Sequence, residues 1–139
     1  MFNYKEIREI LPQSYPFIMI EKAIFHGNDR LLKGFHYITE SDLNHQNKDN
    51  TIYPFSFIIE GSAQSCILLY KAMFPNAPKN QFLLTGINNS MINGPCFIGN
   101  TLMYVCSFTR IFEKGAFANV LVYVEEEVIG EVNLNFYME

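Results

Sequence analysis

A run of about seventeen residues without a polar face, at positions 57–74, restricts the folds open to this chain more than any other feature. Up to Tyr70 its side chains are apolar or small on every side, apart from Glu60 and Gln64. A helix of this composition has to be buried, and the length favours a helix over a strand. Ser56 is the expected N-cap, and Pro75 lies just beyond the expected end.

Segments with the composition of β-strands lie on both sides of this helix in the sequence. Residues 17–25 and 31–38 flank Gly27-Asn28-Asp29, where Gly and Asn tolerate a positive φ, so a hairpin is predicted. After the helix, an apolar segment and three β-branched, aromatic ones predict about four strands, at residues 82–87, 101–112, 117–125 and 128–138. The last segment alternates with a period of two, which is typical of a strand with one buried face.

The predicted order is a short helix at 3–10, the hairpin, a polar loop at 40–52, the long helix and then the remaining strands. Antiparallel strands around one fully apolar helix predict an α+β fold in which a curled sheet wraps around a buried central helix. That arrangement is the hotdog fold. Periodicity leaves open an α+β sandwich with the helix on one face. Residues 1–139 contain no linker or repeat, which predicts a single domain.

Composition excludes several classes of function. The net charge is −4 and the ten Lys and Arg residues are scattered, so no nucleic-acid partner is expected. The three cysteines have no metal-ligand spacing, and neither a metal nor another cofactor is expected. No signal-peptide core or membrane-spanning run is present, and the odd number of cysteines is typical of a reducing compartment. The cytoplasm is therefore the expected location.

Glu60 and Gln64 are the candidate functional side chains of the long helix. They are four residues apart, so they lie on the same face. A carboxylate near the start of an apolar helix is costly to bury unless it is paired, protonated or open to a cavity. One interpretation is that Glu60 only complements the positive end of the helix dipole. The other is that Glu60 carries out proton transfer.

Three segments of the chain carry recognisable motifs. They are ILPQSYPFIMIEK at residues 10–22, YPFSFIIEGSAQ at residues 53–64, and FLLTGI at residues 82–87 followed by IGNTL at residues 98–102. The first resembles the LPHRYPFLLVDR opening, and the second the MPGVLIIEALAQ helix entry, of the FabZ-type β-hydroxyacyl-acyl-carrier-protein dehydratases. IGNTL stands where that family usually has PGDxL. The order matches and covers almost the whole chain, which also implies the hotdog fold.

The resemblance implies dehydration of a 3-hydroxyacyl thioester carried by an acyl carrier protein or coenzyme A. A histidine takes the proton α to the carbonyl, and an acid on the central helix protonates the departing hydroxyl. Glu60 occupies the acid position, and Gln64 corresponds to the helix glutamine. The histidine and the acid come from different subunits, which implies a homodimer or a heterodimer. The same motifs imply substrate contacts at Tyr15, Pro16, Phe17, Pro54, Phe55 and Ser56.

Two departures from the family pattern bear on activity. The GHFPG motif that holds the catalytic histidine is replaced by NHQNKDN at residues 44–50. The family's spacing between this histidine and the helix acid leads to Gln46 in this chain. A one-residue insertion in the loop would bring the neighbouring His45 to the catalytic position. The alternative is that His45 is a solvated loop histidine. Phe55 replaces the glycine whose N–H polarises the thioester, and its ring is predicted to narrow the tunnel mouth. His26 and His36, on predicted strands, are interpreted as core or surface residues.

Three functions remain open from the sequence. The first is an active dehydratase with His45 as base, Glu60 as acid and Gln64 as support. The second is a catalytically deficient subunit that pairs with an active dehydratase. The third is a hotdog thioesterase, in which Glu60 activates water and no histidine is needed. Enoyl product, lack of activity in a folded dimer, and release of free thiol would distinguish the three.

Overall fold

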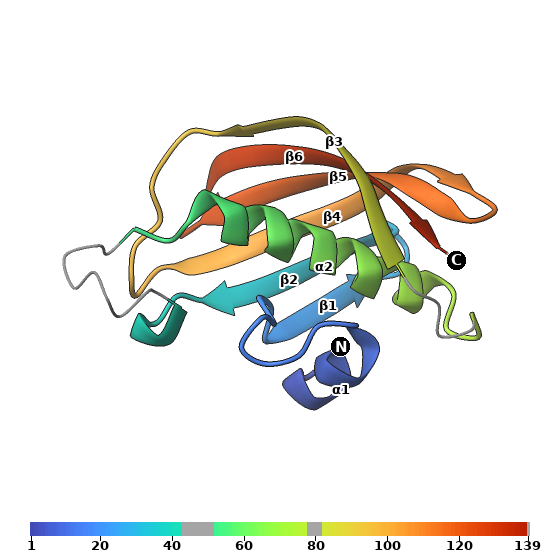
Figure 1. The fold of residues 1–139 in the computed structure, drawn as a ribbon, viewed down its shortest axis with the longest axis horizontal. Helices are drawn as coiled ribbons and strands as arrows, with labels where there is room; N and C mark the ends of the chain where they lie inside the picture. The colour runs from blue at the N-terminus through green and yellow to red at the C-terminus, as the bar shows by residue number, and fades with distance from the viewer. Residues whose placement is uncertain (43–51, 78–81, 139) are drawn as a thin grey trace.

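The fold is one long helix held against a curled six-stranded sheet, in a computed structural model that describes residues 1–42, 52–77 and 82–138 (Figure 1). The sheet order is β1-β2-β4-β5-β6-β3, and every neighbouring pair is antiparallel. Its strands are β1 (Lys22–His26), β2 (Leu31–Tyr37), β3 (Phe82–Ile92), β4 (Thr101–Phe112), β5 (Gly115–Val124) and β6 (Glu127–Met138). The helices are α1 (Tyr4–Ile10), the single-turn η1 (Glu40–Asp42) and α2 (Phe55–Met73).

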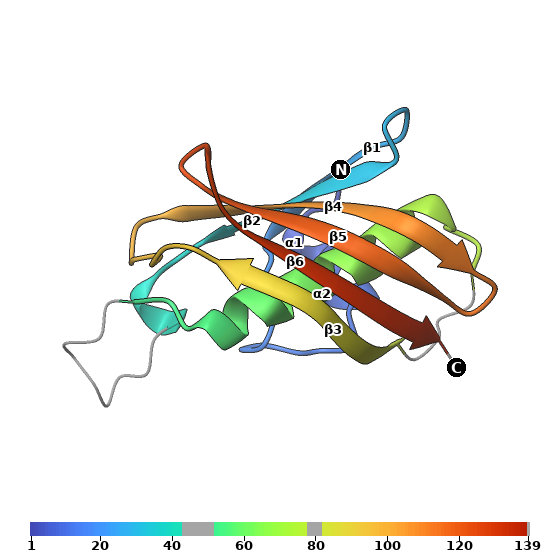
Figure 2. The same ribbon diagram turned by 90° about the horizontal axis from the view of Figure 1, so that it is seen from above.

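α2 packs against β1, β2, β3, β4 and β6, so the sheet wraps around it (Figure 2). This arrangement confirms the predicted hotdog fold rather than an open sandwich. None of the helices in the described parts of the chain combines the length and hydropathy needed to cross a membrane.

α2 begins two residues earlier than predicted. Its N-cap is Pro54, which has an extended backbone and makes no side-chain cap hydrogen bond. The prediction of Ser56 as N-cap was wrong, because Ser56 already lies in the first helical turn. The proline ring fixes φ near the value the chain needs to enter the helix, so the start does not depend on a hydroxyl.

The hairpin forms with different boundaries from those predicted. β1 begins only at Lys22, and residues 17–21 before it are not a strand. The turn places the positive φ at Arg30, with a value of 54°, rather than at Gly27 or Asn28.

β3 continues to Ile92, five residues beyond its predicted end. It is an edge strand that pairs with β6 through two register shifts, and much of its surface is exposed. Its polar residues Asn88, Asn89 and Ser90 therefore need not be buried to belong to the strand. The apolar pattern of the sequence stops before them, which is why the predicted strand was too short.

Tyr104 of β4 is the largest fully buried side chain in the described core. A Cβ placed on Gly61 of α2 would come within 2.5 Å of the Tyr104 hydroxyl oxygen, so glycine permits this close approach of helix and sheet. Among the described residues, the hydroxyl has no hydrogen-bond partner. The ring is therefore well packed while its polar atom is unsatisfied.

Tyr104→Phe is expected to leave the free energy of unfolding unchanged or to raise it by about 1 kcal/mol, because it removes an unsatisfied buried hydroxyl and keeps the ring. Urea unfolding would measure the change. The companion variant Gly61→Ala is expected to lose about 1–3 kcal/mol through overpacking against the same ring. A clear loss of stability in Tyr104→Phe would contradict the absence of a hydroxyl partner.

Candidate active site

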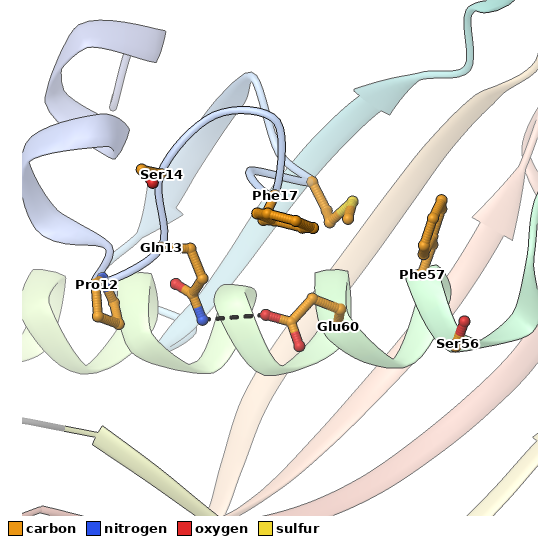
Figure 3. Close-up of a pocket in the computed structure, with 8 residues that line it drawn as sticks. Pro12, Gln13, Ser14, Phe17, Ser56, Phe57 and Glu60 are labelled. Carbon is orange, nitrogen blue, oxygen red and sulfur yellow. Dashed lines mark hydrogen bonds between the residues drawn. The ribbon is translucent and has the colours of Figure 1, made fainter. Parts of the chain in front are cut away.

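A surface cavity of about 550 Å³ opens where the segment after α1 faces the first turns of α2 (Figure 3). Its wall consists of Pro12, Gln13, Ser14, Phe17, Met19, Ser56, Phe57 and Glu60. A smaller cavity of about 70 Å³ shares only Gln13 and Glu60 with this wall and is otherwise mostly apolar. Its remaining wall residues are Ala63, Cys66, Ile67, Phe82, Leu84, Leu134 and Phe136. Gln13 and Glu60 thus lie where an open cavity meets an apolar one.

Glu60 is held by two amide side chains. Its Oε1 accepts a hydrogen bond from Nε2 of Gln13 at 3.0 Å and another from Nε2 of Gln64 at 3.2 Å. Figure 3 shows the Gln13 side chain reaching from its loop toward Glu60 on the helix. Within the described ranges, no hydrogen bond engages Oε2 of Glu60. Oε2 is therefore the oxygen that is free to carry a proton or to meet a ligand.

Gln64 attaches the loop before β1 to the central helix. Its side chain is fully buried. The Met19 N–H donates to Gln64 Oε1 at 2.8 Å, and Gln64 Nε2 donates to the Phe17 carbonyl at 2.7 Å. These bonds fix the orientation of the amide and hold Phe17 and Met19 in the cavity wall. Glu60 and Gln64 share a helix face, as their spacing predicted.

The structure places the other predicted site residues in different surroundings. Phe17 and Ser56 line the open cavity. Within the part of its wall that the structure describes, Tyr15, Pro16, Pro54 and Phe55 are absent. Tyr15 and Phe55 are 74% and 51% exposed, and the peptide bond between Tyr15 and Pro16 is cis. His45 lies outside the described residues, so its role as a base stays a prediction.

The sequence interpretation missed an ion-paired cluster beside the site. The imidazole of His36 is buried; Nδ1 contacts Oε1 of Glu21, and Nε2 lies 3.0 Å from Oδ2 of Asp42. The Tyr53 ring lies 5.4 Å away, centroid to centroid. Burial lowers the pKa of His36, but the hydrogen bonds and charges of the two carboxylates outweigh it and raise that pKa to about 9.

This cluster joins three parts of the chain: β2, the η1 turn and the end of the loop that lines the cavity. Each carboxylate also accepts a backbone hydrogen bond, Glu21 from the Tyr37 N–H at 3.2 Å and Asp42 from the Thr39 N–H at 2.8 Å. A sequence signal for His36 existed, because it shares the inward-facing phase of β2 with Leu32 and Gly34. Its carboxylate partners come from outside the strand, and nothing in the sequence pairs them with it.

In residues 1–42, 52–77 and 82–138, no group of three or more His, Cys, Asp or Glu side chains is arranged so that it could hold a metal ion. Glu60 is the one ionisable side chain in the described wall of the open cavity.

Known proteins of this architecture include dehydratases and thioesterases. The dehydratase heterocomplex ApeI:P from Xenorhabdus doucetiae superposes with a TM-score of 0.79 at 19% identity, over 96% of this chain and 90% of that one. A hypothetical thioesterase from Streptococcus pneumoniae, solved with coenzyme A, gives a TM-score of 0.66 at 8% identity, over 87% and 88%. At these identities the likeness concerns the fold alone. No family model matches the chain.

Sequence relatives are more specific. The 3-hydroxyacyl-acyl-carrier-protein dehydratase FabZ of Campylobacter lari is 30% identical over 140 residues, which cover 92% of this chain and 95% of the relative. The FabZ protein of a Sulfurovum species is 27% identical, with 96% and 95% covered. The matches extend through both the loop and the helix that meet at Glu60. This chain therefore belongs to the FabZ family of 3-hydroxyacyl-acyl-carrier-protein dehydratases.

Proposed function

We propose that this chain is a dehydratase that removes water from a 3-hydroxyacyl thioester carried by an acyl carrier protein or coenzyme A. The observation that carries the proposal is the position of Glu60, between an open cavity and an apolar one, with Oε1 engaged by two amides and Oε2 engaged by none of the described residues. The open cavity fits the thioester end of a substrate, and the apolar cavity fits the start of an acyl chain.

The proposed reaction uses one base and one acid. The base, proposed to be His45 of a second subunit, takes the proton from the carbon α to the thioester carbonyl. The electrons of that C–H bond form the double bond, the C–O bond at the β carbon breaks, and the proton on Glu60 Oε2 joins the departing oxygen. The products are a 2-enoyl thioester and water. Glu60 is left ionised and the base protonated, and proton return restores both.

Two further groups support this chemistry. Gln64 holds Oε1, so the acidic proton is confined to Oε2. Ser56 lies in the cavity wall and in the first turn of α2, where backbone N–H groups have no helical acceptor. Such an N–H group is suited to polarise the thioester carbonyl as negative charge develops on it. We further propose that the chain acts as a single hotdog domain within a dimer.

A second candidate is a subunit that pairs with an active dehydratase. The observation in its favour is that NHQNKDN at residues 44–50 stands in place of the family's GHFPG motif. A thioesterase, which needs only the Glu60 carboxylate to activate water, fits the same observation.

Incubation of the purified protein with a 3-hydroxyacyl N-acetylcysteamine thioester tests these candidates together. Enoyl absorbance without release of free thiol is expected for the dehydratase. Release of free thiol would identify a thioesterase and overturn the proposal. If a folded dimer gives neither enoyl absorbance nor free thiol, the proposal is also overturned, and the partner-subunit function is favoured.

A further inference from the structure

We propose that the apolar cavity admits only a short acyl chain, and that Phe136 sets this limit from the end of the cavity opposite Glu60. This inference rests on the proposed function and deepens it, because it names the length class of the substrate. The cavity has a volume of about 70 Å³. A methylene group needs about as much room as a water molecule, about 30 Å³, so about two such groups fit beyond the β carbon beside Glu60, which corresponds to chains of about four to six carbons.

One face of α2 gives the cavity its direction. Glu60, Ala63 and Ile67 of the described wall are spaced by three and four residues, so they lie in a row along the helix. Tyr70 continues this row one turn further on, but it is not part of the described wall. With a rise of about 1.5 Å per residue, Tyr70 lies about 15 Å from Glu60 along the helix axis. The cavity therefore runs from Glu60 toward Tyr70 and ends before it.

Phe136 lies at this far end. It belongs, with Leu134, to the buried face of β6 and to the described wall. The centroid of its ring is 6.1 Å from that of Tyr70 and 6.0 Å from that of Phe82, the first residue of β3. Phe82 is also a wall residue, and its ring lies 6.0 Å from Tyr70. The two phenylalanines therefore close the cavity at its Tyr70 end.

Aromatic neighbours hold the ring of Phe136 in place. Besides Tyr70 and Phe82, Phe108 of β4 lies 5.7 Å away, centroid to centroid. Separations of this size are typical of favourable contacts between aromatic rings. The side chain is only 6% exposed, and a close-packed interior resists the displacement of one large ring because its neighbours would have to move as well. An acyl chain long enough to reach Phe136 would therefore lose affinity.

Binding of stable pantetheine amides measures this limit without requiring turnover. The compounds carry 3-hydroxyacyl chains of four, six, eight and ten carbons, and titration calorimetry gives their affinities. For the wild-type protein, affinity is expected to rise up to about six carbons as apolar contact grows. It is expected to fall by about tenfold or more from six to ten carbons, because the longer chain overpacks the closed end. In Phe136→Leu, which leaves space at that end, this fall is expected to shrink to about threefold or less.

Two further variants accompany Phe136→Leu. Phe82→Leu, at the same end of the cavity, is expected to reduce the fall in the same direction, which guards against misfolding of one variant. Phe117→Leu is the matched control, because its ring packs on Phe112 and neither residue is in the described wall. The wild-type fall is expected to remain in this control.

Four results would overturn the inference: equal affinity for six and ten carbons in the wild type, an unchanged fall in both cavity variants, the same reduction in Phe117→Leu, or no binding at any length. A length limit that depends on Phe136, in a protein that forms no enoyl product, would uphold the inference and reject the proposed dehydration. Formation of enoyl product at equal rates from six-carbon and ten-carbon thioesters would do the reverse.

Discussion

Glu60→Gln is expected to lower turnover of a 3-hydroxyacyl thioester by about 10²- to 10⁴-fold, the usual contribution of a positioned general acid. The variant keeps the shape of the side chain, and its Oε1 can still accept from Gln13 and Gln64. An amide nitrogen replaces Oε2, and it cannot deliver a proton to the departing hydroxyl. The rate of enoyl formation at saturating substrate would measure the effect, with little change expected in KM.

The matched control is the same substitution at Glu9, an exposed residue of α1, which is expected to leave turnover unchanged. His45→Ala examines the base independently of the acid. Near-normal turnover by Glu60→Gln would mean that another group protonates the hydroxyl. The carboxylate would then only complement the N-terminus of α2, the alternative that its sequence position also allows.

The parts of the site that the sequence predicted are those set by local geometry. Glu60 and Gln64 were placed on one helix face because a spacing of four residues decides it. α2 itself was predicted because an apolar run of that length has to be buried. The start of the helix was not, since Pro54 provides the turn by its ring rather than by a cap hydrogen bond.

The parts that the sequence did not predict depend on contacts between distant residues. Gln13 and Glu60 are 47 positions apart, and only the path of the loop over α2 brings them together. Gln13 stands within a recognised motif, but the motif does not say which atom it touches. His36 shows the same limit, since Glu21 precedes it by 15 positions and Asp42 follows its strand in a turn.

His36→Leu is expected to lower the free energy of unfolding by about 3 kcal/mol near pH 6, because it leaves two carboxylates facing each other without the buried cation. The shift of the His36 pKa from 6.5 to about 9 corresponds to roughly the same energy. The side chain is only 3% exposed, so solvent does little to screen it. Asp42, at 17%, is also mostly shielded, whereas Glu21, at 45%, is screened by solvent and contributes less.

The pH dependence of this stabilisation follows from the directions of the two shifts. The His36 pKa is raised on folding, so its contribution is complete below about pH 6.5 and is lost as the pH rises to about 9. Burial raises the pKa of Asp42, but hydrogen bonds from His36 and Thr39 outweigh it and lower that pKa. Its contribution is present above its ordinary value and is lost as the pH falls through the lowered one.

The difference in stability between wild type and His36→Leu is therefore expected to be largest between about pH 4 and 6.5 and to narrow toward pH 9. Urea unfolding across this range would measure it. His26→Leu is the matched control, because Nε2 of His26 is buried without a partner in the described chain, so its removal breaks no hydrogen bond of that atom and no comparable loss is expected. A constant difference at all pH values would show that His36 acts by packing alone. If so, the link between β2, η1 and the cavity loop would not depend on charge.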